Sequence, residues 1–577
     1  MTGIRKRIVR RSVTDAVDLG RDLPPLLQRL YQARGVREAR ELDYQLRALT
    51  PPDQLRGVAD AARRLAEAIE RQARILIVGD FDADGATSTA VALLGLSMLG
   101  AQRLDYRVPS RFADGYGLTP GIVTRLQTEG ALPDVLLTVD NGISAHEGIQ
   151  AARDAGLEVI VTDHHLPGET LPDAHAIVNP NQPGCDFVSK NAAGVGVMFY
   201  LLTAIRQLQR AAGLYTDTPQ PPLGDLLDLV ALGTVADVVP LDHNNRILVD
   251  QGLRRIRAGR TRPGIQALLQ VAGRDADQLS ATDLGFVLGP RLNAAGRLDD
   301  MSRGIECLTT SDPDRALALA RELDALNRER RSIEGEMRTQ AMETLNELTL
   351  NTRELPAGLC LFDESWHQGV IGILASRIKE QHHRPVVAFA PADEGLIKGS
   401  ARSIAGLHIR DVLAAVDARA PGLLHAFGGH AMAAGMTLQQ SDYERFAELF
   451  NAQVTAMAEP NAFDPSIVTD GDLAPPELTL ATARLLNEAG PWGQQFPEPR
   501  FDGEFILVNQ RIVGERHLKL LVQVPGQDLL LDGIAFNVDT EQWPAQCERA
   551  RLVYQLDVNR FRGRESVQLR VDYLEPA

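Results

Sequence analysis

The sequence predicts an α/β protein with two unequal α/β lobes joined by a long helix, followed by a C-terminal all-β barrel. Three observations support this fold class. In the N-terminal half, short β-branched runs alternate with helical stretches, which is typical of a parallel sheet whose strands are buried on both faces. A long charged stretch with helical periodicity begins at Ser311. Residues 503–577 consist of short alternating segments that favour a small barrel.

Length and composition limit the protein classes that fit. The chain has 577 residues, room for three or four domains, and its 44% hydrophobic and 24% charged residues are globular in character. No apolar run approaches the roughly 20 residues needed to cross a bilayer, and no apolar region follows the basic N-terminus, so we expect no signal peptide. The four cysteines (Cys185, Cys307, Cys360 and Cys547) form no CxxC pair. This indicates a reducing cytoplasm rather than a disulfide scaffold or a cysteine zinc site.

The overall charge is acidic. There are 60 Lys and Arg residues against 76 Asp and Glu residues, giving a formal net charge of −16. Proteins that coat nucleic acid without specificity are usually basic. Any polyanion must therefore be bound by local basic patches on an acidic body.

The elements of the first lobe follow a short helical lead-in over residues 24–52. Strands are expected at 74–79, 135–139 and 159–162, and helices at 61–72, 87–99 and 144–155. Each of these strands is followed at once by Asp, Gly, Asn or His. In parallel α/β sheets the chemistry lies just beyond the carboxyl ends of the strands, which is where this sequence places its acidic residues.

The second half begins with a capped helix start at Ser311-Asp-Pro-Asp314, and this helix is expected to run to about Leu348. The second α/β lobe follows, with a strand at 386–389, and then a loose polar join. Barrel strands are expected at 505–508, 517–524, 529–536, 552–558 and 567–571. The predicted segments are a lead-in (1–55), a metal-binding domain (56–310), a connecting helix (311–350), a second lobe (351–460), and a linker with an oligonucleotide-binding (OB) barrel (461–577).

The sharpest motif is Gly79-Asp80-Phe81-Asp82-Ala83-Asp84-Gly85, in which three carboxylates alternate directly after a strand. Their mutual repulsion becomes favourable only around a cation, and hard carboxylates suit Mg²⁺ or Mn²⁺. A calcium EF-hand loop begins in the same way. A buried strand before the motif, and Val91 rather than Glu at the twelfth position, argue against that interpretation.

Further ligand-type residues end other apolar segments. Asp140 follows the second strand, Asp163-His164-His165 follow the third, and Asp237 ends another apolar stretch. Imidazole together with several carboxylates indicates Mn²⁺ or mixed Mn²⁺ and Mg²⁺ use. Such a set can hold two ions, which together activate water and stabilise an in-line phosphoryl displacement. Because each Asp must be ionised to bind, we expect activity to fall at acid pH.

Residues suited to phosphate accompany this set. Arginine binds phosphate through two hydrogen bonds, and glycine lets the backbone approach closely. The candidates are Arg111, Tyr116, Arg291, Asn293, Arg297, Ser400, Arg402 and His430. The barrel interleaves cations with aromatics, which suits single-strand binding. Its candidates are Arg511, Arg516, Lys519, Arg551, Arg560, Arg562, Arg564, Tyr554 and Phe561.

Together these motifs resemble the DHH phosphoesterase superfamily, which is named for the triplet that stands here as Asp163-His164-His165. Within it they resemble the bacterial RecJ exonuclease family. The resemblance covers nearly the whole chain. Its segments are 78–90, 108–119, 137–145, 161–169, 231–242, 289–301, 366–381, 427–437, 513–520 and 532–539.

The resemblance implies a DHH lobe, a DHHA1 lobe and an OB barrel. It also implies a 5′-to-3′ exonuclease of DNA repair and recombination that degrades single-stranded DNA to 5′-mononucleotides. The implied partners are single-strand-binding protein and a helicase, with the enzyme a cytoplasmic monomer. The implied metal ligands are Asp82, Asp84, Asp140, His164 and Asp237, with Asp140 bridging two ions and Asp80 and Asp163 beside them as ligands or their supports.

By the same resemblance, His165 hydrogen-bonds the reacting phosphate. The terminal 5′-phosphate is bound by Arg111, Tyr116, either Arg291 or Arg297, Ser400 and Arg402, and His430 contacts the strand backbone. Two rival functions remain open from the sequence. One is a DHH enzyme of small substrates such as short oligoribonucleotides, cyclic dinucleotides or pyrophosphate. The other is a non-catalytic replication scaffold.

Overall fold

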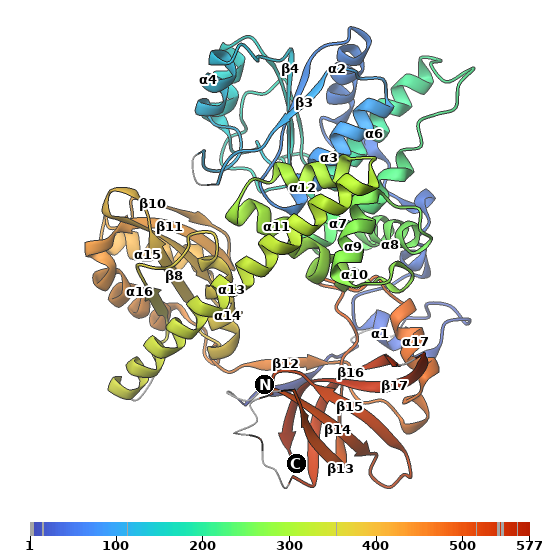
Figure 1. Ribbon diagram of the computed structural model, residues 1–577, viewed down its shortest axis with the longest axis vertical. Coiled ribbons are helices and arrows are strands. Elements are labelled where there is room, and N and C mark those ends of the chain that lie inside the picture. The colour runs from blue at the N-terminus through green and yellow to red at the C-terminus, as the bar shows by residue number, and fades with distance from the viewer. Residues whose placement is uncertain are drawn as a thin grey trace. The chain divides into compact units, whose positions relative to one another are not determined.

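The computed structural model describes residues 5–13, 17–111, 114–352, 355–514, 516–538, 543, 547–561 and 563–577 (Figure 1). The chain forms two compact units. The first comprises Val13–Asn327 with Asn487–Glu498, and the second comprises Met1–Ser12, Arg328–Leu486 and Pro499–Ala577. Within the described residues, no helix is both long enough and apolar enough to cross a membrane.

The first unit is built on a five-stranded parallel sheet with strand order β3-β2-β4-β5-β6. The central strands are buried at every position except Glu158, as the continuous apolar runs predict. The parallel sheet is thereby confirmed. Its strands are β2 (Ile75–Val78), β3 (Leu104–Arg107), β4 (Val135–Val139), β5 (Glu158–Thr162) and β6 (Ala176–Val178).

Helices cover both faces of this sheet. On one face, α4 (Pro120–Thr128) and α5 (His146–Asp154) form a core with the strands, in which Leu126 and Ile149 join Leu76 and Val159. On the other face lie α2 (Val58–Glu70), α3 (Ala83–Met98) and α6 (Gly194–Ala211) (Figure 1). With both faces covered, the loops at the carboxyl ends of the strands are left to carry the polar side chains.

The rest of the first unit is helical. α7 packs against α8 and α3, and α12 packs against α3 and α9. The separate segment Asn487–Glu498 joins this unit through Trp492 and Phe496, whose rings stack with Tyr31 at 5.9 and 6.1 Å between centroids. These helices are α1 (Pro25–Gln32), α7 (Leu227–Ala236), α8 (His243–Arg257), α9 (Pro263–Ala272), α10 (Ala281–Asp283), α11 (Gly289–Leu298) and α12 (Ser302–Thr309).

The predicted long helix is present as α13 (Pro313–Thr352). It begins with proline at its first position, where the missing N–H costs nothing because no intrahelical partner exists there. The chain passes from the first unit to the second within this helix, between Asn327 and Arg328.

The second unit contains a mixed sheet with strand order β10-β11-β9-β8-β7, in which only β7 and β8 are parallel. Its mainly aliphatic core includes three phenylalanines, with Phe389 edge-on to Phe446 at 5.4 Å and Phe446 stacked on Phe450 at 5.7 Å. The strands are β7 (Leu359–Phe362), β8 (Val386–Pro391), β9 (Leu396–Arg402), β10 (Ala426–Gly429) and β11 (Ala433–Gln439). The helices are α14 (Ile371–His382), α15 (Ile409–Arg419) and α16 (Tyr443–Met457).

The same unit carries the predicted closed barrel, with strand order β13-β14-β15-β17-β16. Parallel pairing of β15 with β17 closes it. The helix α17 (Leu480–Glu488) precedes the barrel in the chain. The strands are β13 (Phe501–Val513), β14 (His517–Gln523), β15 (Leu530–Ala535), β16 (Arg549–Phe561) and β17 (Arg564–Pro576).

Two short strands differ from the expected helical lead-in and loose join. β1 (Arg7–Arg10) pairs in parallel with β12 (Ser466–Thr469). Arg10 donates from Nε and Nη2 to the buried carboxylate of Asp502, at 3.0 Å each, and Thr469 also donates to this carboxylate. Each strand has only four residues and its partner is far away in the sequence, so neither gives a local signal. The boundaries between the five predicted segments stay predictions.

Candidate active site

Acidic loops follow three adjacent strands of the parallel sheet. β2 is followed by Asp80, Asp82 and Asp84, β4 by Asp140, and β5 by Asp163. Because the three strands are parallel neighbours, these loops meet at one edge. Asp237 reaches the same place from the C-terminal end of α7, as its 3.5 Å separation from the imidazole of His164 demonstrates.

The first acidic loop is held by its own backbone and by α6. Asp82 is the N-cap of α3, and its Oδ1 accepts hydrogen bonds from the N–H groups of Asp84 and Gly85, both at 3.0 Å. The buried carboxylate of Asp84 accepts from the N–H groups of Gly194, at 2.7 Å, and Val195, at 3.0 Å. These bonds fix the orientation of both carboxylates.

Asp140 occupies a strained position. Its φ is +61°, in the left-handed region of the backbone that residues other than glycine rarely adopt. A Cβ atom on Gly194 would lie 2.6 Å from both Cβ and Oδ1 of Asp140, so only glycine fits there. The absence of a side chain at Gly194 therefore lets α6 pack directly against the Asp140 carboxylate.

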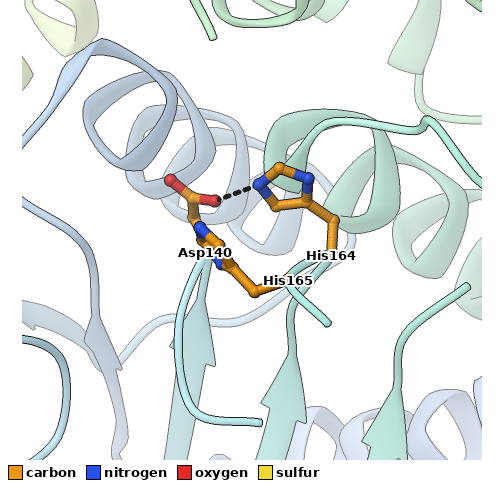
Figure 2. A group of neighbouring side chains, drawn as sticks. All are labelled: Asp140, His164 and His165. Carbon is orange, nitrogen blue, oxygen red and sulfur yellow. Dashed lines mark ion pairs between the residues drawn. The ribbon is translucent and has the colours of Figure 1, made fainter. Parts of the chain in front are cut away.

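His164 faces the carboxylates from β5. Its Nε2 lies 3.1 Å from Oδ1 of Asp140, 3.5 Å from Oδ2 of Asp237 and 3.9 Å from Oδ2 of Asp84 (Figure 2 shows the first of these pairs). The His164 Nε2 and Asp140 Oδ1 atoms are close, yet their geometry makes no hydrogen bond. Among the described residues, both are buried polar atoms without a hydrogen-bond partner. Buried polar atoms in this condition are uncommon unless an ion or a water molecule satisfies them.

Three overlapping sets of side chains bring their ligand atoms within 4.8 Å of one another: Asp80 with Asp82 and Asp140; Asp84 with His164 and Asp237; and Asp140 with His164 and His165. Asp140 and His164 each belong to two sets. Carboxylate oxygens with one or two imidazole nitrogens suit Mn²⁺ and Mg²⁺, so the residues present fit two such ions.

The pKa values report the same crowding. Burial, followed by the charge of Asp82, raises the pKa of Asp80 to about 8 and that of Asp84 to about 7. Burial and neighbouring carboxylates also raise the pKa of Asp140 and of Asp237 well above the usual range. A bound cation lowers these pKa values again, because it favours the ionised form of every carboxylate around it.

Asp163 organises the two histidines. Its Oδ1 accepts from the N–H groups of His164, at 2.7 Å, and His165, at 3.1 Å, and lies 2.7 Å from His165 Nδ1; Oδ2 accepts from Ile143 N–H at 2.8 Å. Although burial opposes ionisation, the hydrogen bond and charge of His165 lower the pKa of Asp163. Burial would lower the pKa of His165, but the bond to Asp163 raises it to about 9.

His164 differs from its neighbour, because burial lowers its pKa to about 4. At neutral pH the structure thus holds a neutral imidazole, the form that binds metal, beside a cationic imidazole, the form that donates to phosphate. The triplet Asp163-His164-His165 therefore supplies both the neutral and the cationic imidazole.

An aromatic group supports two of the predicted phosphate-binding residues. The guanidinium of Arg111 lies over the Phe81 ring, 4.1 Å from its centroid, and Tyr116 meets Phe81 edge-on at 6.1 Å. The Tyr116 hydroxyl is 3.3 Å from His165 Nδ1 and 3.4 Å from the carbonyl oxygen of Asp140. The sequence predicts no role for Phe81, because the motif that contains it is interpreted through its carboxylates alone. Phe112 and Ala113 of the adjoining motif lie outside the described residues.

The candidates on α11 have different environments. Arg291 is buried, with Nε 3.0 Å and Nη2 2.9 Å from Asp324 Oδ1, and its Nη1 donates to the carbonyl of Val287 at 2.6 Å. Asn293 accepts a hydrogen bond from the N–H of Ala83 at 2.9 Å, so it supports the acidic loop. Arg297 lies half-buried in the last turn of the helix.

Ser400, Arg402 and His430 belong to the second unit. Ser400 and Arg402 are two positions apart on β9, and Arg402 Nη1 donates to Ser400 Oγ at 3.0 Å and to the Ala401 carbonyl at 2.8 Å. Burial lowers the pKa of Arg402, and within the described part of the chain no carboxylate pairs with it. His430 is exposed in the turn between β10 and β11.

The barrel candidates divide into surface and structural residues. Arg511 on β13 stands directly opposite Lys519 on β14. Phe561 is 65% exposed, whereas Tyr554 is a core residue, 1% exposed, and offers no ring for stacking. Arg551 binds Asp502, and Arg560 binds Glu565. Arg562 lies outside the described residues.

Comparison with known proteins identifies the three parts. The model of the DHH family N-terminal domain matches residues 74–234, the DHHA1 domain matches 356–456, and the RecJ OB domain matches 469–573. These ranges correspond to the parallel-sheet lobe, the mixed-sheet lobe and the barrel.

Curated relatives match over the full length. The chain is 54% identical to the single-stranded-DNA-specific exonuclease RecJ of Escherichia coli K12 over 98% of both chains, and 55% identical to that of Dickeya dadantii over 98% of this chain and 99% of the relative. The crystal structure of RecJ from Thermus thermophilus in complex with Mn²⁺ has a TM-score of 0.79 at 31% identity, covering 99% of this chain and 79% of that chain. The chain therefore belongs to the RecJ family of DHH proteins.

Proposed function

We propose that this chain is a metal-dependent 5′-to-3′ exonuclease that degrades single-stranded DNA to 5′-mononucleotides in DNA repair and recombination. The observation that carries the proposal is the convergence of five aspartates and two histidines at one sheet edge, where Asp140 Oδ1 and His164 Nε2 are buried and find no hydrogen-bond partner among the described residues. The family relationship supports the substrate, because relatives above 50% identity are single-stranded-DNA-specific exonucleases.

The metal is Mn²⁺ or Mg²⁺, two ions per site. Solved complexes of the Thermus thermophilus relative contain one or the other of these ions. Asp80, Asp82 and Asp140 would hold one ion, and Asp84, His164 and Asp237 would hold the other. When bound, the pair supplies an activated water and charge stabilisation for displacement at phosphorus.

Of the other two residues of the triplet, His165 binds the substrate and Asp163 orients His165. Asp163 keeps His165 protonated through the 2.7 Å bond at Nδ1, so that Nε2, which lies 3.4 Å from the Tyr116 hydroxyl, carries a proton to donate to a phosphate oxygen. This donation stabilises negative charge that develops on the phosphate in the transition state. The Tyr116 hydroxyl lies 3.3 Å from Nδ1 and 3.4 Å from Nε2 of this imidazole and so limits its rotation.

Recognition of the 5′-end rests on guanidinium groups. Arg402, with Ser400, is a half-buried cation with neutral partners, the environment that favours an anionic ligand. Arg111 is held on Phe81, with its Nε buried and unsatisfied among the described residues. Either Arg291 or Arg297 of α11 completes the set; Arg291 is held in place by Asp324 and the Val287 carbonyl. His430 contacts the strand backbone.

The barrel binds the rest of the strand. Arg511 and Lys519 are like charges placed directly opposite each other, an arrangement that destabilises a sheet unless an anion lies between them. The exposed ring of Phe561 adds a surface for base stacking. Together they fit an extended polyanion.

A time course on DNA labelled at one end tests the proposal. A single strand labelled at its 5′-end should lose the label as mononucleotide from the first time points, only with Mn²⁺ or Mg²⁺ present, whereas blunt duplex stays intact. Internal fragments would contradict an exonuclease. Faster cleavage of a dinucleotide than of a long strand would favour a small-substrate enzyme, and no metal-dependent release would favour a scaffold.

We further propose that the protein is a cytoplasmic monomer with single-strand-binding protein and a helicase as its partners. All four cysteines are unpaired, consistent with a reducing compartment. Sedimentation of the purified chain, alone and with each partner, tests this assembly state; a stable dimer would contradict it.

A further inference from the structure

One glycine in the second unit faces the proposed 5′-phosphate ligands. Gly372 is the second residue of α14, which follows β7 in the chain and packs against β8 and β9. It belongs to the motif Trp366-His-Gln-Gly-Val-Ile-Gly-Ile373, to which the proposed function assigns no role. The inference about Gly372 rests on that proposed function, because it concerns Ser400 and Arg402.

The space at Gly372 is occupied by those two side chains. A Cβ atom there would lie 2.8 Å from Arg402 Nη2, 2.9 Å from Ser400 Oγ and 3.6 Å from Arg402 Cζ. Contacts this short force a shift. The atoms that would have to move are the ends of side chains, not backbone. A side chain at position 372 would therefore displace the Arg402 guanidinium while leaving the backbone of the lobe in place.

The backbone does not require glycine at this position. Gly372 lies in the first turn of α14, and its φ is outside the left-handed region, so alanine can adopt the same backbone conformation. Close approach of other atoms is therefore the physical reason for glycine here. The three atoms nearest to a Cβ at this position all belong to Arg402 and Ser400.

In the wild-type protein the Arg402 guanidinium has a defined position. Arg402 Nη1 bonds Ser400 Oγ at 3.0 Å and the Ala401 carbonyl at 2.8 Å, and Nη2 is the atom that approaches Gly372. Two-point binding of a terminal phosphate requires both guanidinium edges to be oriented. We propose that Gly372 is a positioning residue that holds Arg402 and Ser400 in register for the 5′-phosphate and so sets the preference for phosphorylated ends.

Comparison of Gly372→Ala with a matched helix glycine tests this. Gly335 of α13 lies in the same unit, and a Cβ there meets no atom within 4 Å, so Gly335→Ala changes helix propensity alone. The readouts are kcat/KM on a 5′-phosphorylated and a 5′-hydroxyl strand of the same sequence, and the thermal midpoint. Gly372→Ala should lower the ratio of the two rates about tenfold or more, mainly through KM, at an unchanged or higher midpoint. Gly335→Ala should keep the wild-type ratio.

Two further variants separate this inference from the proposed function. In Arg402→Ala, adding Gly372→Ala should change the ratio no further, since the two act through one group. If Arg402→Ala loses the preference and Gly372→Ala retains it, the role of Gly372 is overturned and that of Arg402 stands. If Arg402→Ala retains it, both are overturned. A marked fall in the thermal midpoint of Gly372→Ala would also overturn the inference, because glycine would then be needed for the stability of the lobe.

Discussion

The Nδ1 atom of His165 lies 2.7 Å from Oδ1 of Asp163, and the same oxygen accepts the backbone N–H of both histidines in the triplet. One buried carboxylate thus fixes the direction of His165 and sets its charge. If His165 donates to the substrate phosphate as proposed, its chemistry depends on Asp163.

Asp163→Asn should lower kcat about 10- to 100-fold, because the amide neither orients His165 with the same strength nor maintains its charge. The pKa of His165, followed by NMR in the metal-free protein, should fall from about 9 toward its ordinary value. Asp154→Asn, a change on α5, is the control. An unshifted His165 titration would contradict the assigned role.

His164→Ala should reduce metal-dependent cleavage by roughly a thousandfold or more, since it removes a neutral nitrogen that faces three carboxylates. Affinity for a long single strand, measured by fluorescence anisotropy, should stay within about twofold because the barrel is unchanged. His146→Ala, an exposed histidine of the same lobe, should keep full activity. Near-normal turnover of His164→Ala would remove it from the metal site.

Metal affinity should rise with pH. The raised pKa values of Asp80, about 8, and Asp84, about 7, mean that the metal-free protein carries protons at neutral pH that the ions must displace. Calorimetry of Mn²⁺ binding in two buffers of different ionisation enthalpy should detect proton release at about pH 7 and less of it about two pH units higher. Proton uptake, or affinity independent of pH, would contradict this.

Phe81→Leu should weaken binding of the 5′-end, because the Arg111 guanidinium loses the ring beneath it. A cation–π contact contributes about 0.5–2 kcal/mol, equivalent to a rise in KM of roughly 2- to 30-fold on short phosphorylated strands. Phe81→Tyr retains the ring and should restore the wild-type KM. Equal KM values for all three proteins would show that the stacking has no part in binding.

The double change Arg511→Gln and Lys519→Gln should weaken binding of long single strands and reduce the slope of log affinity against log salt by about 1.4, about 0.7 for each lost phosphate contact. Cleavage of very short oligonucleotides should change little. Arg560→Gln, which removes a cation already paired with Glu565, should have a smaller effect on the slope. A slope equal to that of the wild type would exclude this face of the barrel.

The sequence predicts the strands of the first lobe closely, because fully buried parallel strands give continuous apolar runs; the expected strand at 135–139 coincides with β4. The side chains at the sheet edge were also predictable, since parallel strands bring their carboxyl ends together. The hydrogen bonds that hold the Asp84 carboxylate were not predictable. Its partners, the N–H groups of Gly194 and Val195, come from a helix more than a hundred residues away, and backbone donors carry no residue signature.

The environment of the α11 arginines was not predictable either. Arg291 and Arg297 look alike in the sequence, but Arg291 is buried and binds Asp324, which lies 33 positions further along the chain. Tyr554 is in phase with the buried Leu552 and Leu556 of β16, and its ring contacts Phe501 and Phe505 in the core, so the alternation of this strand already argued against a surface ring. Long-range packing, which leaves no local pattern, brought Asp324 to Arg291.

The pairing of β1 with β12 affects the order in which the chain can assemble during synthesis. Arg10 and Asp502 are 492 positions apart, so the ribosome has made most of the polypeptide before the first strand meets either partner. During that time the leading segment has no strand to pair with, and a product that stops before Ser466 never forms this pair. Pairing of β1 thus requires synthesis through β12, and a fusion placed ahead of Arg7 would burden this late step of assembly rather than an early one.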